Sequence, residues 1–182
     1  MLTIRLGQFV TTDERVRLEG EGLVLREWTE GDLDVMVQLF DEPIIAWRTP
    51  LPSPFKRVDA EQHLARARRR DPLLLAAAVE DEPPLGEVMI TSQAHLAYII
   101  GRQHRGQALA SRALLTAADY AFLMLRTPVL RLEIEPDNHA SAAVARRTGF
   151  APSRAPAATV EDKGRTFTLQ LRERRRKPDG TG

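Results

Sequence analysis

The residue pattern with the clearest chemical meaning lies at 101–108, where a glycine-containing loop follows a predicted strand and leads into a predicted helix. The first N–H groups of a helix have no partners within the helix, and the aligned peptide dipoles add partial positive charge at that end, so such a junction binds anions. Gly106 lets the backbone approach a phosphate closely, Ala108 is small, and Arg102 and Arg105 add positive charge. The pattern predicts a phosphate site, although a tight turn with solvated arginines would contain the same residues.

A second group of polar residues follows farther along the chain. Asn138 begins a predicted short helix and Ser141 lies one turn on, so both side chains can face the same side. The alternative is that Asn138 only caps the helix and Ser141 is a polar surface residue. Glu133 and Glu135 alternate with apolar residues in the preceding strand, so both point to one face, which is either a cleft or solvent. A hydroxyl and carboxylates placed in this way could donate and accept protons.

Other candidates for the site come from earlier segments. His95 precedes a predicted strand, and its imidazole suits proton transfer near neutral pH, although a turn histidine that contacts water is an equal alternative. Glu87 lies on a neighbouring strand. The Pro-rich segment 43–54 predicts a loop, in which Trp47 and Arg48 either line an acceptor pocket or fill the core beneath it.

The composition excludes several other kinds of chemistry. The 182 residues include no cysteine, which rules out disulfides, thiolate nucleophiles and Cys-ligated zinc. There is no GxGxxG, GxxxxGK[ST] or GxSxG motif, and the four histidines lack the spacing of a metal site on a helix, so we expect no metal. A formal net charge of +1 argues against dedicated nucleic-acid binding, although the basic C-terminal residues could contact RNA. No apolar run is long enough to span a membrane, so we expect a cytoplasmic protein.

The hydrophobic pattern predicts an α/β fold (α+β, mixed) in which helices flank a mixed, largely antiparallel sheet. Strands are expected at 23–25, 73–80, 85–91, 96–100, 130–135 and 167–171, and helices after a capping box at 29–32, at 58–70, from 108 onward and at 138–147. The expected order is β, α, α, β, β, β, α, β, α, β. We expect residues 1–175 to form a single domain, with 1–20 as an N-terminal extension and 176–182 as a flexible basic tail.

With these elements in place, the chain resembles the GNAT superfamily of acyl-CoA-dependent N-acetyltransferases. The motifs that carry the resemblance are Gln103-x-x-Gly106-x-Ala108, Glu133-Ile-Glu135-Pro-Asp-Asn138-x-x-Ser141 and Gly149-Phe150. Within the superfamily it is most similar to the RimJ/RimL branch, which acetylates the N-terminal alanine of ribosomal proteins. The resemblance implies that the two middle strands, around 98–100 and 132–135, splay apart to admit the pantetheine arm of acetyl-CoA. Ala108 departs from the family pattern, which more often has glycine there.

The resemblance also implies roles for individual residues. The cofactor-binding residues would be Ile99, Ile100, Gln103, Arg105, Gly106, Gln107, Ala108, Leu109, Ala110, Asn138 and Ser141. Asn138 would bond the pantetheine arm, a backbone N–H near Ile99 would polarise the thioester carbonyl, and Ser141 would protonate the departing sulfur. Judged by where the strands would place them, the candidates for the proton acceptor are His95, Glu87, Glu133 and Glu135, of which His95 and Glu133 join Ser141 in the predicted catalytic set. The acceptor cleft would be lined by Trp47, Arg48 and Glu87.

The implied function is direct transfer of an acetyl group from acetyl-CoA to a primary amine, foremost the N-terminal α-amine of a protein or peptide. Two alternatives stay open: a small-molecule amine such as an aminoglycoside is the acceptor, or the chain is a non-catalytic acyl-CoA sensor. A polycationic acceptor needs an acidic cleft, whereas a peptide needs fewer acids, so the charge around the opening separates the first two functions. The short apolar runs lead us to expect no membrane partner, and a homodimer stays open.

Overall fold

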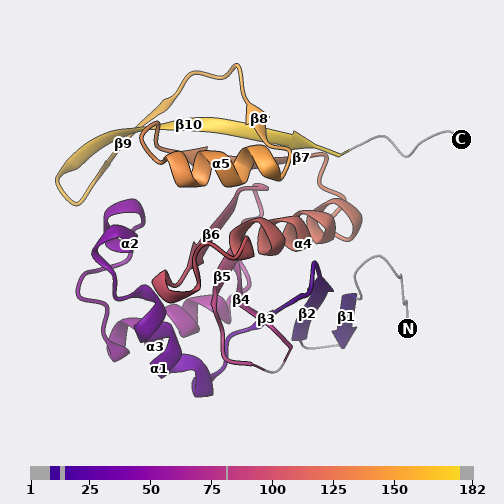
Figure 1. The fold of residues 1–182 in the computed structure, drawn as a ribbon, viewed down its shortest axis with the longest axis vertical. Helices are drawn as coiled ribbons and strands as arrows, with labels where there is room; N and C mark the ends of the chain where they lie inside the picture. The colour runs from indigo at the N-terminus through magenta and orange to yellow at the C-terminus, as the bar shows by residue number, and fades with distance from the viewer. Residues whose placement is uncertain (1–8, 13–14, 81, 177–182) are drawn as a thin grey trace, which may run out of the picture.

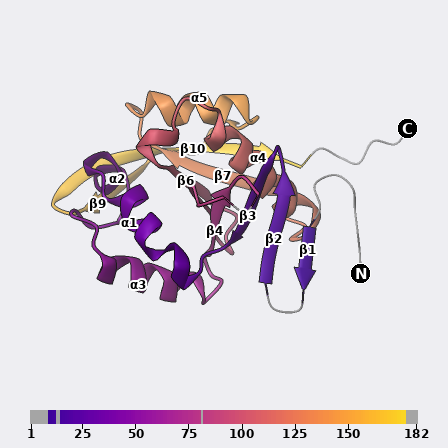
Figure 2. The same ribbon diagram turned by 60° about the horizontal axis from the view of Figure 1, so that its bottom comes forward.

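The computed structural model describes residues 9–12, 15–80 and 82–176. Their strands form a six-stranded sheet in the order β1-β2-β3-β4-β5-β6 and a four-stranded sheet in which β10 lies between β7 and β8 and also pairs with β9. Neighbouring strands within each sheet run antiparallel. Figures 1 and 2 show α4 and α5 on one side of the molecule and α1 and α3 on the other.

The strands and helices have the following bounds. The first half of the chain contains β1 (Phe9–Thr12), β2 (Arg15–Gly20), β3 (Leu23–Glu27), the short 3₁₀ helix η1 (Glu30–Asp32), α1 (Leu33–Phe40), α2 (Pro43–Arg48), α3 (Arg57–Ala67), β4 (Leu73–Ala78) and β5 (Gly86–Ile90). The second half contains β6 (Leu96–Ile100), η2 (Arg102–His104), α4 (Leu109–Leu123), β7 (Val129–Ile134), α5 (His139–Arg147), β8 (Ala151–Pro152), β9 (Ala158–Asp162) and β10 (Arg165–Arg175).

The predicted fold class is confirmed, and the ten predicted elements occur in the expected order, but the described chain contains further elements between them. The prediction of a loop across 43–54 is wrong for its first part, which forms α2. Pro43 occupies the first turn of that helix, where its missing N–H costs nothing and its fixed φ favours helix. The sequence analysis also missed β1 and β2 in the predicted extension at 1–20, and β8 and β9, which gain their hydrogen bonds from partner strands.

Some expectations about the chain ends stay predictions. That residues 1–175 form a single domain stays a prediction. The predicted flexible tail at 176–182 lies outside the described residues, apart from residue 176. Among the described helices, none is long and apolar enough to cross a membrane.

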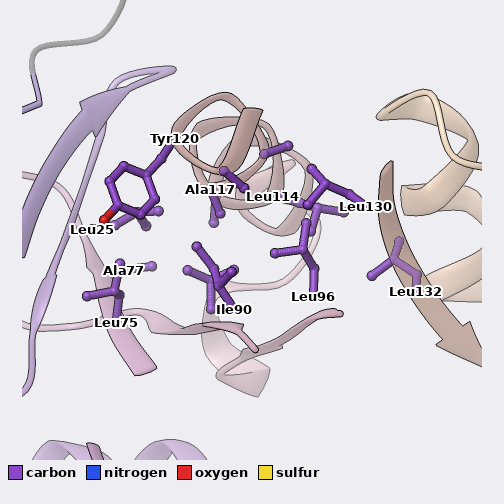
Figure 3. Packing of buried hydrophobic residues seen from close by; sticks show 14 of the residues in the cluster. Leu25, Leu75, Ala77, Ile90, Leu96, Leu114, Ala117, Tyr120, Leu130 and Leu132 are labelled. Carbon is purple, nitrogen blue, oxygen red and sulfur yellow. The ribbon is translucent and has the colours of Figure 1, made fainter. Parts of the chain in front are cut away.

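Two hydrophobic clusters lie on the two faces of the six-stranded sheet. The larger one contains side chains of α4 together with strands of both sheets, among them Leu96 of β6, Leu130 of β7 and Leu114 of α4. Figure 3 shows these three side chains converging in the same layer. The smaller cluster packs α1 and α3 against the other face and includes Trp28 and Phe40. Both faces of the six-stranded sheet are therefore covered by closely packed side chains.

The two sheets diverge between β6 and β7. The only strand-like pairing that connects them in the described chain is a parallel bridge between His95 and Arg131, where the Arg131 N–H donates to the Ala94 carbonyl at 2.9 Å. Beyond this bridge β6 and β7 belong to separate sheets. The predicted splay of the two middle strands is confirmed.

Candidate active site

A cavity of about 660 Å³ opens in the space between the diverging strands, and it is lined by β6, β7, the start of α4 and one face of α5. Most residues predicted to bind the cofactor line it: Ile99, Ile100, Arg105, Gly106, Ala108, Leu109, Ala110, Asn138 and Ser141. The structure does not place the side chains of Gln103 and Gln107 among the lining residues. The fold thus brings together the loop after β6 and the start of α5, which are far apart in sequence.

The loop before α4 has the geometry of an anion site. Gly106 has a φ of +82° and Ala108, the N-cap of α4, has a φ of +57°, so the chain turns twice through the left-handed region before the helix. The first turn of α4 carries no acidic side chain that would compete for its free N–H groups. A Cβ added at Gly106 would have no atom within 4 Å, so this face of the loop is open. These features fit a diphosphate resting on the backbone.

The sequence predicted that Arg105 would face a phosphate, but in the structure its side chain binds a carboxylate. Its guanidinium forms two hydrogen bonds with the Glu42 carboxylate, at 2.9 and 2.5 Å, and its Nε donates to the Ile100 carbonyl at 3.1 Å. Glu42 directly precedes α2. Arg105 therefore ties the phosphate loop to α2, and its positive charge is largely matched by this carboxylate.

The register of the strands determines which backbone groups face the gap. The Gly101 N–H donates to Leu85 and the Thr91 N–H to His95, so odd-numbered residues of β6 pair with β5. Because the hydrogen bonds of an antiparallel strand alternate sides, the N–H groups of Tyr98 and Ile100 point toward β7. The expected backbone donor near Ile99 is therefore one of its two neighbours, since Ile99 itself pairs with β5.

The start of α5 faces the same cavity. Asn138 caps the helix, because its side-chain oxygen accepts a hydrogen bond from the Ser141 N–H at 3.1 Å. The capping role thus exists together with a place in the cavity lining. Since the Asn138 oxygen is engaged, its NH₂ group is the part left to donate to a ligand.

The proton-transfer candidates lie on the sheet face opposite α4. Glu133 lines the cavity, and its Oε2 lies 3.6 Å from Nδ1 of His95 at the vertex of the splay. His95 itself is not among the lining residues. The structure thus brings these two predicted catalytic residues side by side but gives only Glu133 direct access to the cavity.

Arg48, Glu135, Asp137 and Arg165 form a network of charged side chains at the solvent-exposed edge of the cavity, which is called the cavity mouth below. Arg48 binds Asp137 through two hydrogen bonds of 2.7 and 3.0 Å and contacts Glu135 at 3.1 Å. Arg165 also pairs with Glu135, and its guanidinium lies 4.2 Å from the ring centre of Trp47. The hydrogen bond with Asp137 raises the pKa of Arg48, and the same bond lowers the pKa of Asp137. The pairing with Arg48 therefore favours the ionised form of Asp137.

Two predicted acceptor residues lie elsewhere. Glu87 is buried and does not line the cavity; its Oε2 accepts hydrogen bonds from Trp28 Nε1 at 2.8 Å and pairs with His63 Nε2 at 2.7 Å. Glu87 therefore belongs to the core beneath α1 and α3. Trp47 is 57% exposed and lies against Arg165 rather than in the cavity lining. Of the three predicted acceptor residues, the structure places Arg48 alone in the lining.

Sequence patterns did not select two cavity residues that carry hydroxyl groups. Tyr98 lies on β6 and Ser111 on the first turn of α4, and both hydroxyls are buried without a hydrogen-bond partner among the described residues. Alternation along β6 could have identified Tyr98, because it shares the inner face with Leu96 and Ile100. Ser111 follows directly after the predicted loop residues, so an extension of the loop by one residue would have found it.

The family is shown by sequence. The profile of the acetyltransferase (GNAT) domain matches residues 22–151, which is more than half of the chain. The chain therefore belongs to the GNAT family, and it is an N-acetyltransferase. No curated protein matches it by sequence.

Solved structures are similar in fold. A GNAT-family acetyltransferase from Bacillus anthracis has a TM-score of 0.76 at 11% identity, covering 87% of this chain and 98% of its own. RimL, a ribosomal L7/L12 α-N-protein acetyltransferase in complex with coenzyme A, has a TM-score of 0.73 at 16% identity, with coverage of 85% and 94%. Spermidine N-acetyltransferase from Vibrio cholerae, in complex with CoA and spermine, has a TM-score of 0.70 at 17% identity, with coverage of 85% and 95%. At these identities the likeness concerns the fold.

Proposed function

We propose that this N-acetyltransferase uses acetyl-CoA to acetylate the N-terminal α-amine of a protein or peptide, by direct transfer within a ternary complex. The fold does not choose the acceptor, because RimL and spermidine N-acetyltransferase share it and are named for acceptors of different kinds. The choice rests on the charge at the cavity mouth. This observation favours a singly charged amine over a polycation.

The carboxylates at the mouth are already neutralised. Glu135 pairs with Arg48 and Arg165, and Arg48 also binds Asp137. Among the carboxylates that line the cavity, Glu133 alone has no arginine partner in the described part of the chain. A polyamine or aminoglycoside would need several free acids to offset its charge, and the mouth does not supply them. One free carboxylate suits a single ammonium group.

The exposed side chains beside the mouth support a peptide. Ile44 and Trp47 lie on α2 and are 43% and 57% exposed, and Ile44 lines the cavity. Apolar side chains in this position can contact the first residues of a peptide while its amine enters the cavity. Lys163 holds α2 in place, because its Nζ donates to the carbonyls of Ala46 and Thr49 at 2.7 and 2.9 Å.

The residues that line the cavity fit acetyl-CoA, and each group of them has a separate role in the proposed reaction. When bound, acetyl-CoA supplies a thioester whose acetyl carbon is open to attack. The N–H groups at the start of α4 hold its diphosphate, and the N–H of Tyr98 or Ile100 polarises the carbonyl. As the C–N bond forms and the C–S bond breaks, the proton lost by nitrogen passes to Glu133 or, through water, to His95. Ser141 donates a proton to sulfur and regains one from solvent.

The energetic demand on these groups is small. A thiol with a pKa of about 8.5 makes the thiolate about 2 kcal/mol unfavourable at pH 7, which one hydroxyl donor largely offsets. An α-amine with a pKa near 8 is roughly a tenth neutral at pH 7, so a weak base suffices. A lysine amine, with a pKa near 10.4, would need much more help. The modest proton acceptors at this site are therefore matched to an α-amine.

Release of CoA thiol from acetyl-CoA tests the proposal with three acceptors. These are a lysine-free peptide with a free N-terminal alanine, a peptide with a blocked N-terminus and one lysine, and spermidine. We expect kcat/KM to be at least about tenfold higher for the free N-terminus, in line with the difference in amine pKa. A preference for spermidine or for the lysine peptide would refute the assignment. If the protein binds acetyl-CoA but releases no CoA thiol with any of the three acceptors, it is a non-catalytic acyl-CoA sensor.

A further inference from the structure

One arginine in the cavity lining has no part in the mechanism above. Arg147 lies in the last turn of α5 and lines the cavity together with Arg48 and Arg105. Arg48 and Arg105 are both paired with carboxylates, whereas no carboxylate in the described part of the chain pairs with Arg147. The Arg147 guanidinium is therefore available to a ligand in this cavity.

Helical spacing explains why Arg147 lies at the cavity. Ala140, Ala143 and Arg147 are separated by three and four residues, so they share one face of α5, and all three line the cavity. Arg146 is turned by about 100° from Arg147 around the helix axis and does not line the cavity. The cavity face of α5 thus has small apolar side chains followed by one guanidinium near its C-terminal end.

A place at the end of a helix does not by itself call for a ligand. Arg146 and Arg147 are both exposed, and both lie in the last turn of α5, where a positive charge interacts favourably with the helix dipole. The dipole accounts for a cation at either position. Access to the cavity distinguishes Arg147 from its neighbour, and this difference points to a ligand with a negative charge.

The cofactor proposed for the cavity has two separate anionic groups. Acetyl-CoA has a diphosphate in the middle of the molecule and a phosphate monoester on the 3′ carbon of its ribose. The free N–H groups at the start of α4, behind the open turn at Gly106, suit the diphosphate. A guanidinium can bind a phosphate monoester through two parallel N–H···O bonds. Arg147 therefore matches the second anionic group.

We propose that Arg147 binds the 3′-phosphate of coenzyme A and makes the protein prefer CoA to 3′-dephospho-CoA. This inference rests on the proposed function, in which acetyl-CoA occupies the cavity. It gives the two ends of α5 different tasks, since Asn138 and Ser141 serve the thioester end of the cofactor and Arg147 serves the nucleotide end. The 3′-phosphate takes no part in acetyl transfer, so Arg147 affects cofactor affinity and not the chemical step.

The experiment is calorimetric titration of CoA and of 3′-dephospho-CoA into the full chain and its Arg147→Gln variant. Arg147→Gln should bind CoA about five- to twentyfold more weakly than the parent, a loss between that of an exposed ion pair and that of a hydrogen bond to a charged group. The Kd of 3′-dephospho-CoA should be the same in both proteins, because this ligand lacks the phosphate that Arg147 binds. A thermal melt checks that the variant is folded.

The neighbouring residue provides a matched control. Arg146→Gln removes the same charge from the same exposed turn, but its side chain lies outside the cavity lining. This variant should therefore keep both Kd values of the parent. Added salt should reduce the preference of the parent for CoA, because ions screen an exposed charge pair. A preference that does not change with salt would contradict an ionic contact and overturn the inference.

The outcomes separate this inference from the proposed function. If the parent binds neither CoA nor acetyl-CoA, the proposed function fails, and the inference fails with it. If the parent binds both but does not distinguish CoA from 3′-dephospho-CoA, or if Arg147→Gln keeps the preference of the parent, only the role of Arg147 is overturned.

Two further results would also overturn the role of Arg147. Equal losses of affinity for CoA and 3′-dephospho-CoA in Arg147→Gln would mean that Arg147 contacts another part of the cofactor, such as the diphosphate. Equal losses of CoA affinity in Arg146→Gln and Arg147→Gln would mean that the positive charge of the whole helix end attracts the ligand, without a specific contact from Arg147.

Discussion

The substitution Gly106→Ala tests the phosphate loop, because Gly106 and Gly164 form a natural matched pair. Gly106 has a φ of +82° and Gly164 a φ of +70°, and at neither position would a new Cβ meet an atom within 4 Å. Any side chain is strained in this backbone region, by roughly 1–2 kcal/mol. Both alanine variants should therefore lose similar stability, which for a chain of this size lowers Tm by about 2–4 °C per kcal/mol.

The two variants should differ in cofactor affinity. The open space beside Gly106 is the space in which the proposed diphosphate rests, whereas Gly164 lies in the turn between β9 and β10. A methyl group at Gly106 would push the diphosphate away from the backbone N–H groups. Loss of one hydrogen bond to a charged group is worth about 1.5–3 kcal/mol, which corresponds to roughly a 10- to 150-fold weaker Kd.

The assay is calorimetric titration of acetyl-CoA into each variant, together with a thermal melt. Gly164→Ala should bind acetyl-CoA with the Kd of the parent protein despite its lower Tm. If Gly106→Ala binds as tightly as Gly164→Ala, the diphosphate does not rest on this loop. If both lose affinity equally, the cause is stability and not the site.

Three further predictions concern residues that lie outside the cavity lining. A Cβ at Gly86 would lie 2.2 Å from the Ile99 carbonyl oxygen, so Gly86→Ala should displace β6, lower stability by about 1–3 kcal/mol in denaturant melts and reduce turnover. Burial alone would raise the pKa of Asp32, but hydrogen bonds, led by the one from Arg26, outweigh burial and lower that pKa. The ionised Asp32 side chain therefore stabilises the fold above its pKa in the unfolded chain, and this stabilisation is lost as the pH falls through its pKa in the folded protein. Asp32→Asn should be less stable than the parent at pH 7 by about 1 kcal/mol, and this difference in stability should disappear below about pH 4. Lys163→Met should raise the KM of the amine acceptor more than the Kd of acetyl-CoA, because Lys163 bonds the C-terminal end of α2, whereas the phosphate loop contacts Glu42 at the start of that helix.

The sequence predicted those parts of the site that depend on short stretches of chain. The loop before α4 has the backbone geometry of an anion site, and a glycine followed by a helix start predicts that geometry. Asn138 caps α5 through a bond that reaches only three residues, to Ser141. The alternation of residue types predicted that Glu133 and Glu135 share one face, since the strand period is itself local, and both line the cavity.

Side-chain partners, by contrast, were decided by the tertiary structure. Glu87 became a core residue because Trp28, 59 residues away, and His63, 24 residues away, supply its hydrogen bonds. Arg48 is engaged by Asp137 across 89 residues, which removes free acid from the cavity mouth. No local pattern encodes such pairs, because they form only after the chain has folded.

In this N-acetyltransferase, local backbone features follow from the sequence, whereas the partners of side chains follow from the tertiary structure. Backbone periodicity, caps and turns act over a few residues, so they predicted the fold class and the loop before α4, whereas the splay of the two middle strands was expected from the resemblance to the GNAT superfamily. The environment of a side chain depends on elements that meet from distant parts of the chain. Only the tertiary structure could show that the Tyr98 hydroxyl is buried in the cavity without a hydrogen-bond partner among the described residues, and that arginines pair with the acids at the mouth.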